Sequence, residues 1–200
     1  MIAASPVAAG TTVAQRLIDA LATTIADKGL TDSTVADVVR IARMSRRAFY
    51  EHFTDKNDCY RALLQDRTER QIEAIRAAVD LEAPWRDQVR HGIAAWLAQA
   101  QADPTFTLSW IRDAPGLGSR AREVSRTATD AFAALVVAVS HNEKFREAGM
   151  GPLPENAALI LVGGLRELIA TQVERGLSPA TLADDAVAVA CAVLTAYPSA

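Results

Sequence analysis

The sequence predicts an all-α fold of about nine helices. Apolar residues recur every three or four positions along almost the whole chain, and this is the spacing of one face of a helix. No segment shows the strict alternation that a half-buried strand requires. Residues that start or end helices, such as Ser, Asp, Pro and Gly, separate the periodic segments, so we expect the helices to follow one another through short connections.

The first two helices have clear boundaries. Residues 11–28 place apolar side chains on one face, and Gly29 is a natural C-terminal stop because glycine adopts left-handed geometry without strain. Thr34, followed three residues later by a carboxylate, forms a capping-box pattern that opens the second helix. Ser33 is the alternative cap. The second helix is short and ends near Arg43.

The third helix is also predicted to be short. Ser45 can cap it, and it covers residues 46–52. Phe49 and Phe53 share one face of this helix, whereas the two arginines at its start point elsewhere. We therefore expect the phenylalanines to hold the helix against its neighbours and the arginines to stay exposed.

The later helices are longer. Asp55 and Asp58 form a second capping pattern that starts the fourth helix at Lys56, and prolines and glycines mark most of the later boundaries. The predicted fourth to ninth helices cover residues 56–79, 84–102, 104–113, 119–140, 155–174 and 178–197. The chain is expected to divide into a disordered arm (1–10), a three-helix domain (11–55) and a larger helical domain (56–200).

Composition argues against several classes of protein. Cys59 and Cys191 are the two cysteines, and their separation favours a reducing cytoplasm over a disulfide framework or a thiolate metal site. The longest apolar runs are much shorter than the roughly 20 residues of a membrane span. The three histidines are scattered, and the chain has no metalloenzyme, nucleophile-elbow or phosphate-loop motif. We expect no catalytic residue, metal or cofactor.

The second and third helices have the spacing of a helix-turn-helix, since only Arg43 and Met44 separate them. In such a motif the second helix enters the major groove of DNA. The chain carries a net charge of −3, but residues 40–56 hold five basic and two acidic side chains, a local balance of +3. The basic residues are Arg40, Arg43, Arg46, Arg47 and Lys56. Taken alone, such a run can equally be a solvated basic face.

Residues 42–56 read Ala-Arg-Met-Ser-Arg-Arg-Ala-Phe-Tyr-Glu-His-Phe-Thr-Asp-Lys, and they resemble the DNA-binding domain of the TetR (tetracycline-repressor) family. The order Phe-Tyr, then His-Phe, then Asp-Lys is specific to that pattern. One departure is Arg43, where the family usually has glycine. If this residue is left-handed, it costs about 1 to 2 kcal/mol. Arg43 then either adds a phosphate contact that offsets the strain or belongs to a turn that simply differs.

The resemblance implies a transcriptional regulator, expected to be a repressor, that binds a palindromic DNA operator as a homodimer and is released by a small, mainly apolar or aromatic ligand. It implies that Thr34, Tyr50 and Lys56 bind backbone phosphates. It also implies that Ser45, Arg46 and Arg47 face the groove. His52 either reaches a phosphate or only packs and solvates. The predicted DNA-binding residues are Thr34, Arg43, Ser45, Arg46, Arg47, Tyr50, His52 and Lys56.

Aromatic residues of the larger domain mark a candidate ligand pocket, because ligand sites are mostly apolar with a few placed polar groups. The predicted pocket residues are Trp85, Val89, Trp96, Phe106, Trp110 and Phe132. Candidate polar partners are His91, Gln99, Thr107 and Asp130. The alternative for each aromatic side chain is a place in the core, and the sequence does not identify the ligand.

Apolar stripes on the last two predicted helices mark a candidate dimer face. The predicted interface residues are Leu161, Leu165, Leu168, Val189 and Val193, and Gly163 and Gly164 would permit close approach of a second helix. The alternative is that these stripes belong to the core of one subunit and the glycines face the pocket. Two rival functions stay open at this point: a helical enzyme, and a helical adaptor that binds protein and not DNA.

Overall fold

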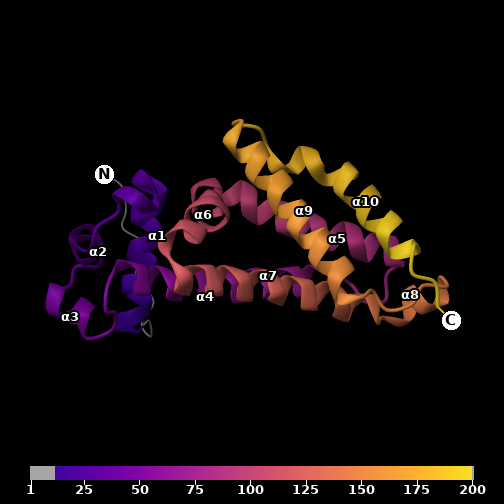
Figure 1. Ribbon diagram of the computed structural model, residues 1–200, viewed down its shortest axis with the longest axis horizontal. Helices are drawn as coiled ribbons and strands as arrows, with labels where there is room; N and C mark the ends of the chain where they lie inside the picture. The colour runs from indigo at the N-terminus through magenta and orange to yellow at the C-terminus, as the bar shows by residue number, and fades with distance from the viewer. Residues whose placement is uncertain (1–11, 200) are drawn as a thin grey trace, which may run out of the picture. The chain divides into compact units, whose positions relative to one another are not determined.

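The computed structural model describes residues 12–199, apart from the side chains at 115, 117, 120 and 121. The predicted arm (1–10) lies outside the described residues. Within them the fold is all-α, as predicted, with one isolated bridge between Met150 and Pro198. The α-helices are α1 (Val13–Asp32), α2 (Val35–Ala42), α3 (Arg46–Tyr50), α4 (Lys56–Ala78), α5 (Trp85–Ala102), α6 (Pro104–Leu108), α7 (Ser119–Ser140), α8 (Glu143–Glu147), α9 (Glu155–Glu174) and α10 (Ala183–Thr195) (Figure 1).

The chain forms two compact units that divide inside α4, after Leu63. The first turns of α4 belong to the N-terminal unit because Cys59, Tyr60 and Leu63 are fully buried and Lys56 bonds to the end of α1. Burial raises the pKa of the Cys59 thiol to about 12, so this cysteine acts as a small core residue.

The starts of α2 and α3 lie where the sequence predicts them, but α1 ends at Asp32 rather than at residue 28, and α3 ends at Tyr50 rather than at residue 52. Gly29 has φ 79° and ψ 167°, which interrupts α1 before its last turn. Thr34 and Asp37 form the predicted capping box of α2, while Ser33 donates a hydrogen bond to the Gly29 carbonyl (2.6 Å). Ser45 caps α3, its hydroxyl accepting from the amide of Ala48 at 3.1 Å. The predicted caps of α2 and α3 are therefore confirmed, whereas α1 continues past the predicted stop at Gly29 to Asp32.

The C-terminal unit contains short elements that the sequence did not predict. The sixth predicted helix is α6 followed by a π-helical turn, η1 (Ser109–Asp113), and a 3₁₀ turn, η2 (Ala114–Leu117). The predicted loop after residue 140 contains α8, and the last helix begins with a 3₁₀ turn, η3 (Pro179–Leu182). Elements of four or five residues are too short to show a helical period, which is why the apolar pattern missed them.

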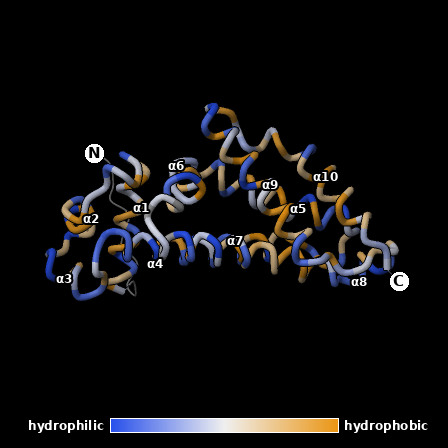
Figure 2. The backbone as a smooth tube through the Cα atoms, in the orientation of Figure 1, coloured by the Kyte–Doolittle hydropathy of each residue, from blue (hydrophilic) through white to orange (hydrophobic). Residues whose placement is uncertain are grey.

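The core of the C-terminal unit centres on stacked aromatic rings. Phe132 of α7 lies between Trp96 and Trp110, with ring centroids 4.7 and 5.7 Å apart. Helix α9 packs on α7, and α10 packs on α5. α9 and α10 are neighbouring antiparallel helices (Figure 1), and Figure 2 shows long hydrophobic stretches on both.

Candidate nucleic-acid interface and ligand cavity

The turn between α2 and α3 places a left-handed residue at its centre. Arg43 has φ 55° and ψ 49°. Its amide bonds to the Arg40 carbonyl (3.3 Å), and the Met44 amide bonds to the Val39 carbonyl (2.9 Å), the pair that defines a Schellman helix end. Arg43 thus occupies the position that glycine usually takes, and among the described residues it is the one non-glycine with positive φ.

This turn is tied to α1 as well. Arg16 of α1 donates a hydrogen bond from Nη2 to the Ala42 carbonyl at 2.9 Å. That carbonyl lies in the last turn of α2, where backbone acceptors lack helical partners. Arg16 therefore fixes the start of the turn relative to α1, and the sequence pattern gave no sign of this contact.

Helix α3 buries one face and exposes the other. Phe49 is fully buried and packs on Phe53, with ring centroids 5.7 Å apart. Arg46 and Arg47 are exposed, and Arg47 pairs with Glu51 at 3.0 Å. Tyr50 is 58% exposed, so its hydroxyl is available to a partner.

Lys56 has an unexpected set of bonds. Its Nζ donates to the carbonyls of Leu30 (2.7 Å), Thr31 (3.2 Å) and Ser33 (2.8 Å), which matches the three donors of an ammonium group. Partial burial lowers the pKa of Lys56. The ammonium therefore joins the start of α4 to the end of α1.

The start of α2 is fixed by a second lysine. Lys28 contacts the Asp37 carboxylate at 2.6 Å, and the Thr34 hydroxyl bonds to the same carboxylate. These hydrogen bonds, that of Lys28 first, hold the pKa of Asp37 well below its usual range. Because Lys28 and Asp37 lie on different helices, this pair sets the angle at which the chain enters α2.

The C-terminal unit contains an apolar cavity of about 350 Å³. Its walls come from α4, α5, α7, α8, α9 and α10, and a volume of this size lies in the range of small-molecule pockets. The polar side chains in the wall are Gln88, Ser140 and Asp185. The cavity therefore suits a mainly apolar molecule.

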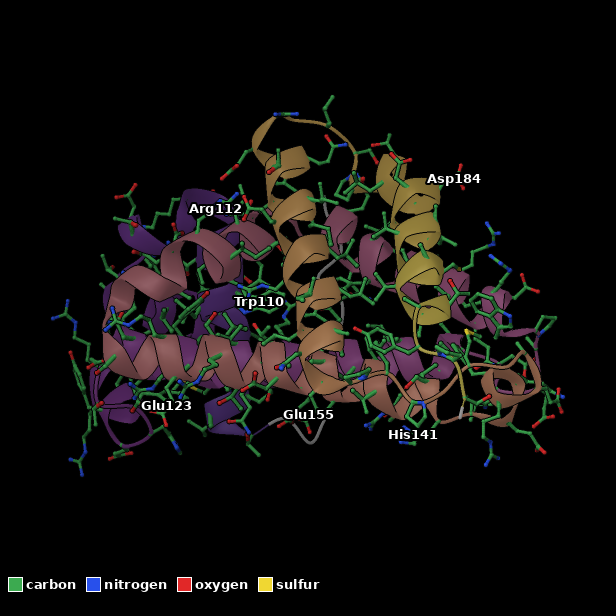
Figure 3. All side chains as sticks on the ribbon, turned by 45° about the vertical axis from the view of Figure 1, so that its right-hand side comes forward. Trp110, Arg112, Glu123, His141, Glu155 and Asp184 are labelled. Carbon is green, nitrogen blue, oxygen red and sulfur yellow. The ribbon has the colours of Figure 1, made fainter. Side chains whose placement is uncertain are left out.

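Charged groups of the C-terminal unit gather away from this cavity. Arg112 of η1 forms paired hydrogen bonds to Glu167 (2.7 and 2.8 Å) and bonds to Glu174 (2.6 Å), joining η1 to α9 (Figure 3). Arg166 lies over the ring of Trp110 (4.7 Å) and bonds to Thr129 (2.6 Å). Neither arginine lines the cavity. Among the described residues, no cluster of His, Cys, Asp and Glu could hold a metal ion.

Residues 17–63 match the family model of bacterial regulatory proteins of the tetR family. This match ends at Leu63, where the N-terminal unit ends. Within this unit the chain is similar to the DNA-binding region of the tetR family. The matched family is one of regulatory proteins, which agrees with the expectation that this chain is a regulator.

Several solved structures have the same fold as this chain. The fatty acid degradation regulator FadR from Bacillus halodurans is 16% identical, with a TM-score of 0.78 over 91% of this chain and 96% of that chain. The transcriptional regulator FadR from Bacillus subtilis, in complex with stearoyl-CoA, is 15% identical, with a TM-score of 0.75 over 90% and 96%. A regulatory protein of the tetR family from Rhodococcus RHA1 is 16% identical, with a TM-score of 0.68 over 95% and 100%. No curated protein matches the chain.

The structure separates the predicted DNA-binding residues of the N-terminal unit into two groups. Seven are exposed: Thr34, Arg43, Ser45, Arg46, Arg47, Tyr50 and His52. Lys56 is half-buried, with its ammonium on three carbonyls. Their contact with DNA stays a prediction. Two residues that position the motif, Arg16 and Lys28, carry no local sequence signal.

The predicted pocket residues are also divided. Val89, Trp96 and Phe132 line the cavity, whereas Trp85, Phe106 and Trp110 do not. None of the four candidate polar partners (His91, Gln99, Thr107, Asp130) lies in the wall. The wall also includes residues that the aromatic pattern missed, namely Ile75, Val79, Gly92, Ile93, Leu135 and Val136.

All five predicted dimer residues line the same cavity. Leu161, Leu165 and Val193 are half-buried against the core, whereas Leu168 (48%) and Val189 (58%) are exposed. Ile160, which the sequence pattern did not single out, is 72% exposed on the same helix as Leu168. Gly163 and Gly164 are exposed, and Gly164 also lines the cavity. Among residues 12–199 we find no helix that is both long and apolar enough to cross a bilayer.

Proposed function

We propose that this TetR-family chain is a transcriptional regulator, acting as a repressor, that binds a palindromic operator as a homodimer and releases it when an apolar ligand enters the cavity. The observation that carries the proposal is α3: a capped helix with a buried phenylalanine below and exposed arginines at its start. A helix of this kind enters the major groove with its N-terminal residues toward the bases.

Arg46 is the residue that we propose for base recognition. It is exposed at the first position of α3, and among the described residues no ion pair holds it. Arg47 is held by Glu51, which suits a phosphate contact of fixed orientation. Thr34, Arg43, Tyr50 and His52 would add backbone contacts, which set register and carry no sequence information.

The DNA test compares arginine variants by fluorescence anisotropy on the promoter next to the chain's own gene and on random DNA. We expect Arg46→Ala to weaken binding to the specific site by about 1 to 3 kcal/mol and to weaken binding to random DNA by less. Arg70→Ala removes an exposed arginine outside the N-terminal unit and should change neither affinity. If Arg46→Ala lowers the affinity for both DNAs equally, Arg46 contacts only phosphate. The absence of any salt-sensitive complex would overturn the proposal.

The dimer is proposed to form through the exposed apolar face of α9 and α10. Ile160, Leu168 and Val189 are large apolar side chains without cover, and the neighbouring glycines leave room for a second backbone, since a Cβ built on either meets no atom within 4 Å. A patch of this kind is usual at a protein interface. A second copy of the same face would cover it through a two-fold axis.

The dimer test uses Ile160→Glu and Leu81→Glu, measured by light scattering after size exclusion. Both residues are exposed aliphatic side chains of the same size, but Leu81 lies in the turn before α5 and outside the proposed interface. We expect Ile160→Glu to give monomers, since a buried unpaired charge is costly. Leu81→Glu should stay dimeric. A monomeric unmodified chain would remove the proposed interface.

The ligand is proposed to carry a long apolar chain. The cavity wall is mostly apolar, and one similar fold was solved in complex with stearoyl-CoA. The charged part of such a molecule would lie outside the cavity, because Asp185 is the charged residue in the described wall.

Stearoyl-CoA added to the protein–DNA complex is therefore expected to release DNA, while CoA alone is not. Val136→Phe should block release by filling the cavity, whereas Val137→Phe, a neighbour outside the wall, should not. Release by CoA alone, or equal release in both variants, would count against a cavity site.

A further inference from the structure

The exposed part of the cavity wall lies entirely on α9 and α10. The wall residues outside these two helices are all buried or half-buried. The exposed wall residues are Ile160, Gly164, Leu168, Asp185 and Val189. The mouth of the cavity is therefore formed by α9 and α10, and the large side chains around it are mainly apolar.

Little charge surrounds this mouth. Residues 156–165 of α9 and 186–195 of α10 contain no charged side chain, and the carboxylate of Glu167 is held by Arg112 at 2.7 Å. An apolar ligand in an open mouth would leave part of its own apolar surface in water, whereas ligand sites bury about 70 to 90% of the ligand surface. An uncharged, apolar cover would complete such a site.

The spacing of the large residues on α9 fits a second copy of the same helix. Ile160 and Leu168 lie four residues before and four residues after Gly164, on one helical face. In an antiparallel pair with a two-fold axis at Gly164, Ile160 meets Leu168 of the partner subunit, and the reverse contact follows by symmetry. A Cβ built on Gly164 meets no atom within 4 Å, so two backbones can approach there. A partner of different sequence would not require this symmetry.

We propose that a second copy of the chain covers the mouth of the cavity, so that the ligand site is complete only in the dimer. The roof is formed by Ile160 and Leu168 of the partner subunit. This inference rests on the dimer and the cavity of the proposed function, and it adds a coupling between them. A ligand that binds the roofed cavity more tightly strengthens the dimer by the same factor, because linkage between binding equilibria is reciprocal. Ligand then releases DNA from an intact dimer and not by separating the subunits.

The coupling test compares stearoyl-CoA binding to monomers and dimers by calorimetry. Ala192→Glu supplies the monomer, because Ala192 is exposed three residues after Val189 but does not line the cavity. Ala98→Glu, at an exposed position of α5 outside the wall, is the matched control and should stay dimeric. We expect the monomer to bind stearoyl-CoA about tenfold more weakly, the ratio for covering roughly 55 Å² of apolar surface. The dimer dissociation constant of the unmodified chain should fall by about the same factor for each bound ligand.

A cross-linking test examines the roof without any ligand. In the antiparallel pair, Ile160 lies beside Leu168 of the partner subunit, whereas the two copies of Ile160 are about 12 Å apart along the helix axis. That separation is too long for a disulfide. The double variant Ile160→Cys/Leu168→Cys should therefore form a disulfide-linked dimer under mild oxidation, and neither single variant should. The native Cys59 and Cys191 are buried, so they should not contribute.

Equal affinity of monomer and dimer for stearoyl-CoA would overturn the inference. Tighter binding by the monomer would also overturn it, since the partner would then fill the cavity and not roof it. An Ala192→Glu variant that stays dimeric, or a dimeric double-cysteine variant that does not cross-link, would overturn the roof while the proposed dimer survives. If stearoyl-CoA binds neither form, the coupling and the ligand part of the proposed function both fail, while the DNA part is untouched.

Discussion

The two units of the chain use polar side chains in different ways. In the N-terminal unit, polar groups fix helix ends: Thr34 and Ser45 cap helices, and Arg16 and Lys56 bind backbone carbonyls. In the C-terminal unit, polar groups are nearly absent from the cavity wall. A rigid helix end is needed to place side chains in a DNA groove, whereas an apolar cavity selects its ligand mainly by shape. The N-terminal unit is thus built for fixed geometry and the C-terminal cavity for tolerance.

Two buried phenylalanines give the largest expected effects and separate the roles of the units. Phe49→Ala and Phe132→Ala each remove a ring that is at most 1% exposed, and each should lower the free energy of unfolding by about 3 to 5 kcal/mol. Phe49→Ala should also abolish DNA binding under conditions where the protein is still folded, because Phe49 holds α3. Urea unfolding and anisotropy measure the two effects.

Phe132→Ala serves as the control for the first variant. It enlarges the cavity and should leave DNA affinity within a few tenths of a kcal/mol when no ligand is added. If both variants lose DNA binding to the same degree, the difference between the units is one of stability alone.

A Lys56 variant tests whether this lysine binds DNA phosphate, as the family resemblance implies, or only joins α4 to the end of α1. Lys56→Met keeps the aliphatic stem and leaves the carbonyls of Leu30, Thr31 and Ser33 without their donor. We expect a loss of about 1 to 3 kcal/mol in unfolding free energy, with the slope of log affinity against log salt unchanged. A slope reduced by about one unit at unchanged stability would instead support the phosphate contact that the family resemblance implies.

The boundaries of the N-terminal helices could be predicted because their signals are local. A cap and its partner amide are three residues apart, as in Thr34 with Asp37, and Gly29 interrupts α1 by its own backbone geometry. The link made by Lys56 could not be predicted, since its acceptors are 23 to 26 residues away. Sequence periodicity shows which residues share a helix face, but not which atoms of another helix lie opposite.

The residues that line the cavity are even harder to predict from the sequence. Aromatic character predicts Trp96, Phe132 and Trp110 alike as pocket residues. Trp96 and Phe132 line the cavity, whereas Trp110 packs on Phe132 outside the wall. Ile75 of α4 and Val79, directly after α4, line the cavity without any sequence feature that distinguishes them from core residues. Leu165 and Val193 lie on the predicted stripes but face partly inward, because the crossing of α9 and α10 decides which side of a stripe is covered.

Arg43 offers a smaller effect of opposite sign. Arg43→Gly should raise the unfolding free energy by about 1 kcal/mol, because glycine adopts the left-handed geometry without a Cβ clash. Arg43→Ala removes the charge but keeps the Cβ, so it should not stabilise the protein. If Arg43 also binds phosphate, both variants should lose about one unit of salt slope. A slope unchanged in both would leave Arg43 as a strained turn residue with no part in DNA binding.

The smallest expected effect concerns the C-terminal unit, where Arg112 joins η1 to α9. Its hydrogen bonds lower the pKa of Glu167 and of Glu174 below their ordinary value of 4.5. A carboxylate with a lowered folded-state pKa stabilises the fold above its ordinary pKa, and this contribution is lost as pH falls through the folded pKa. Arg112→Gln should therefore destabilise the protein slightly at pH 7, and the difference from the unmodified chain should shrink as pH falls below 4.5 and vanish once pH is below the lowered pKa values of the two carboxyls. The effect is small because exposed ion pairs are screened by solvent. Thermal unfolding of both proteins between neutral and acidic pH measures it. Arg146→Gln is the control, since Arg146 forms no ion pair with any described residue. A difference that persists in acid would mean that Arg112 stabilises α9 through packing of its stem and not through its charge.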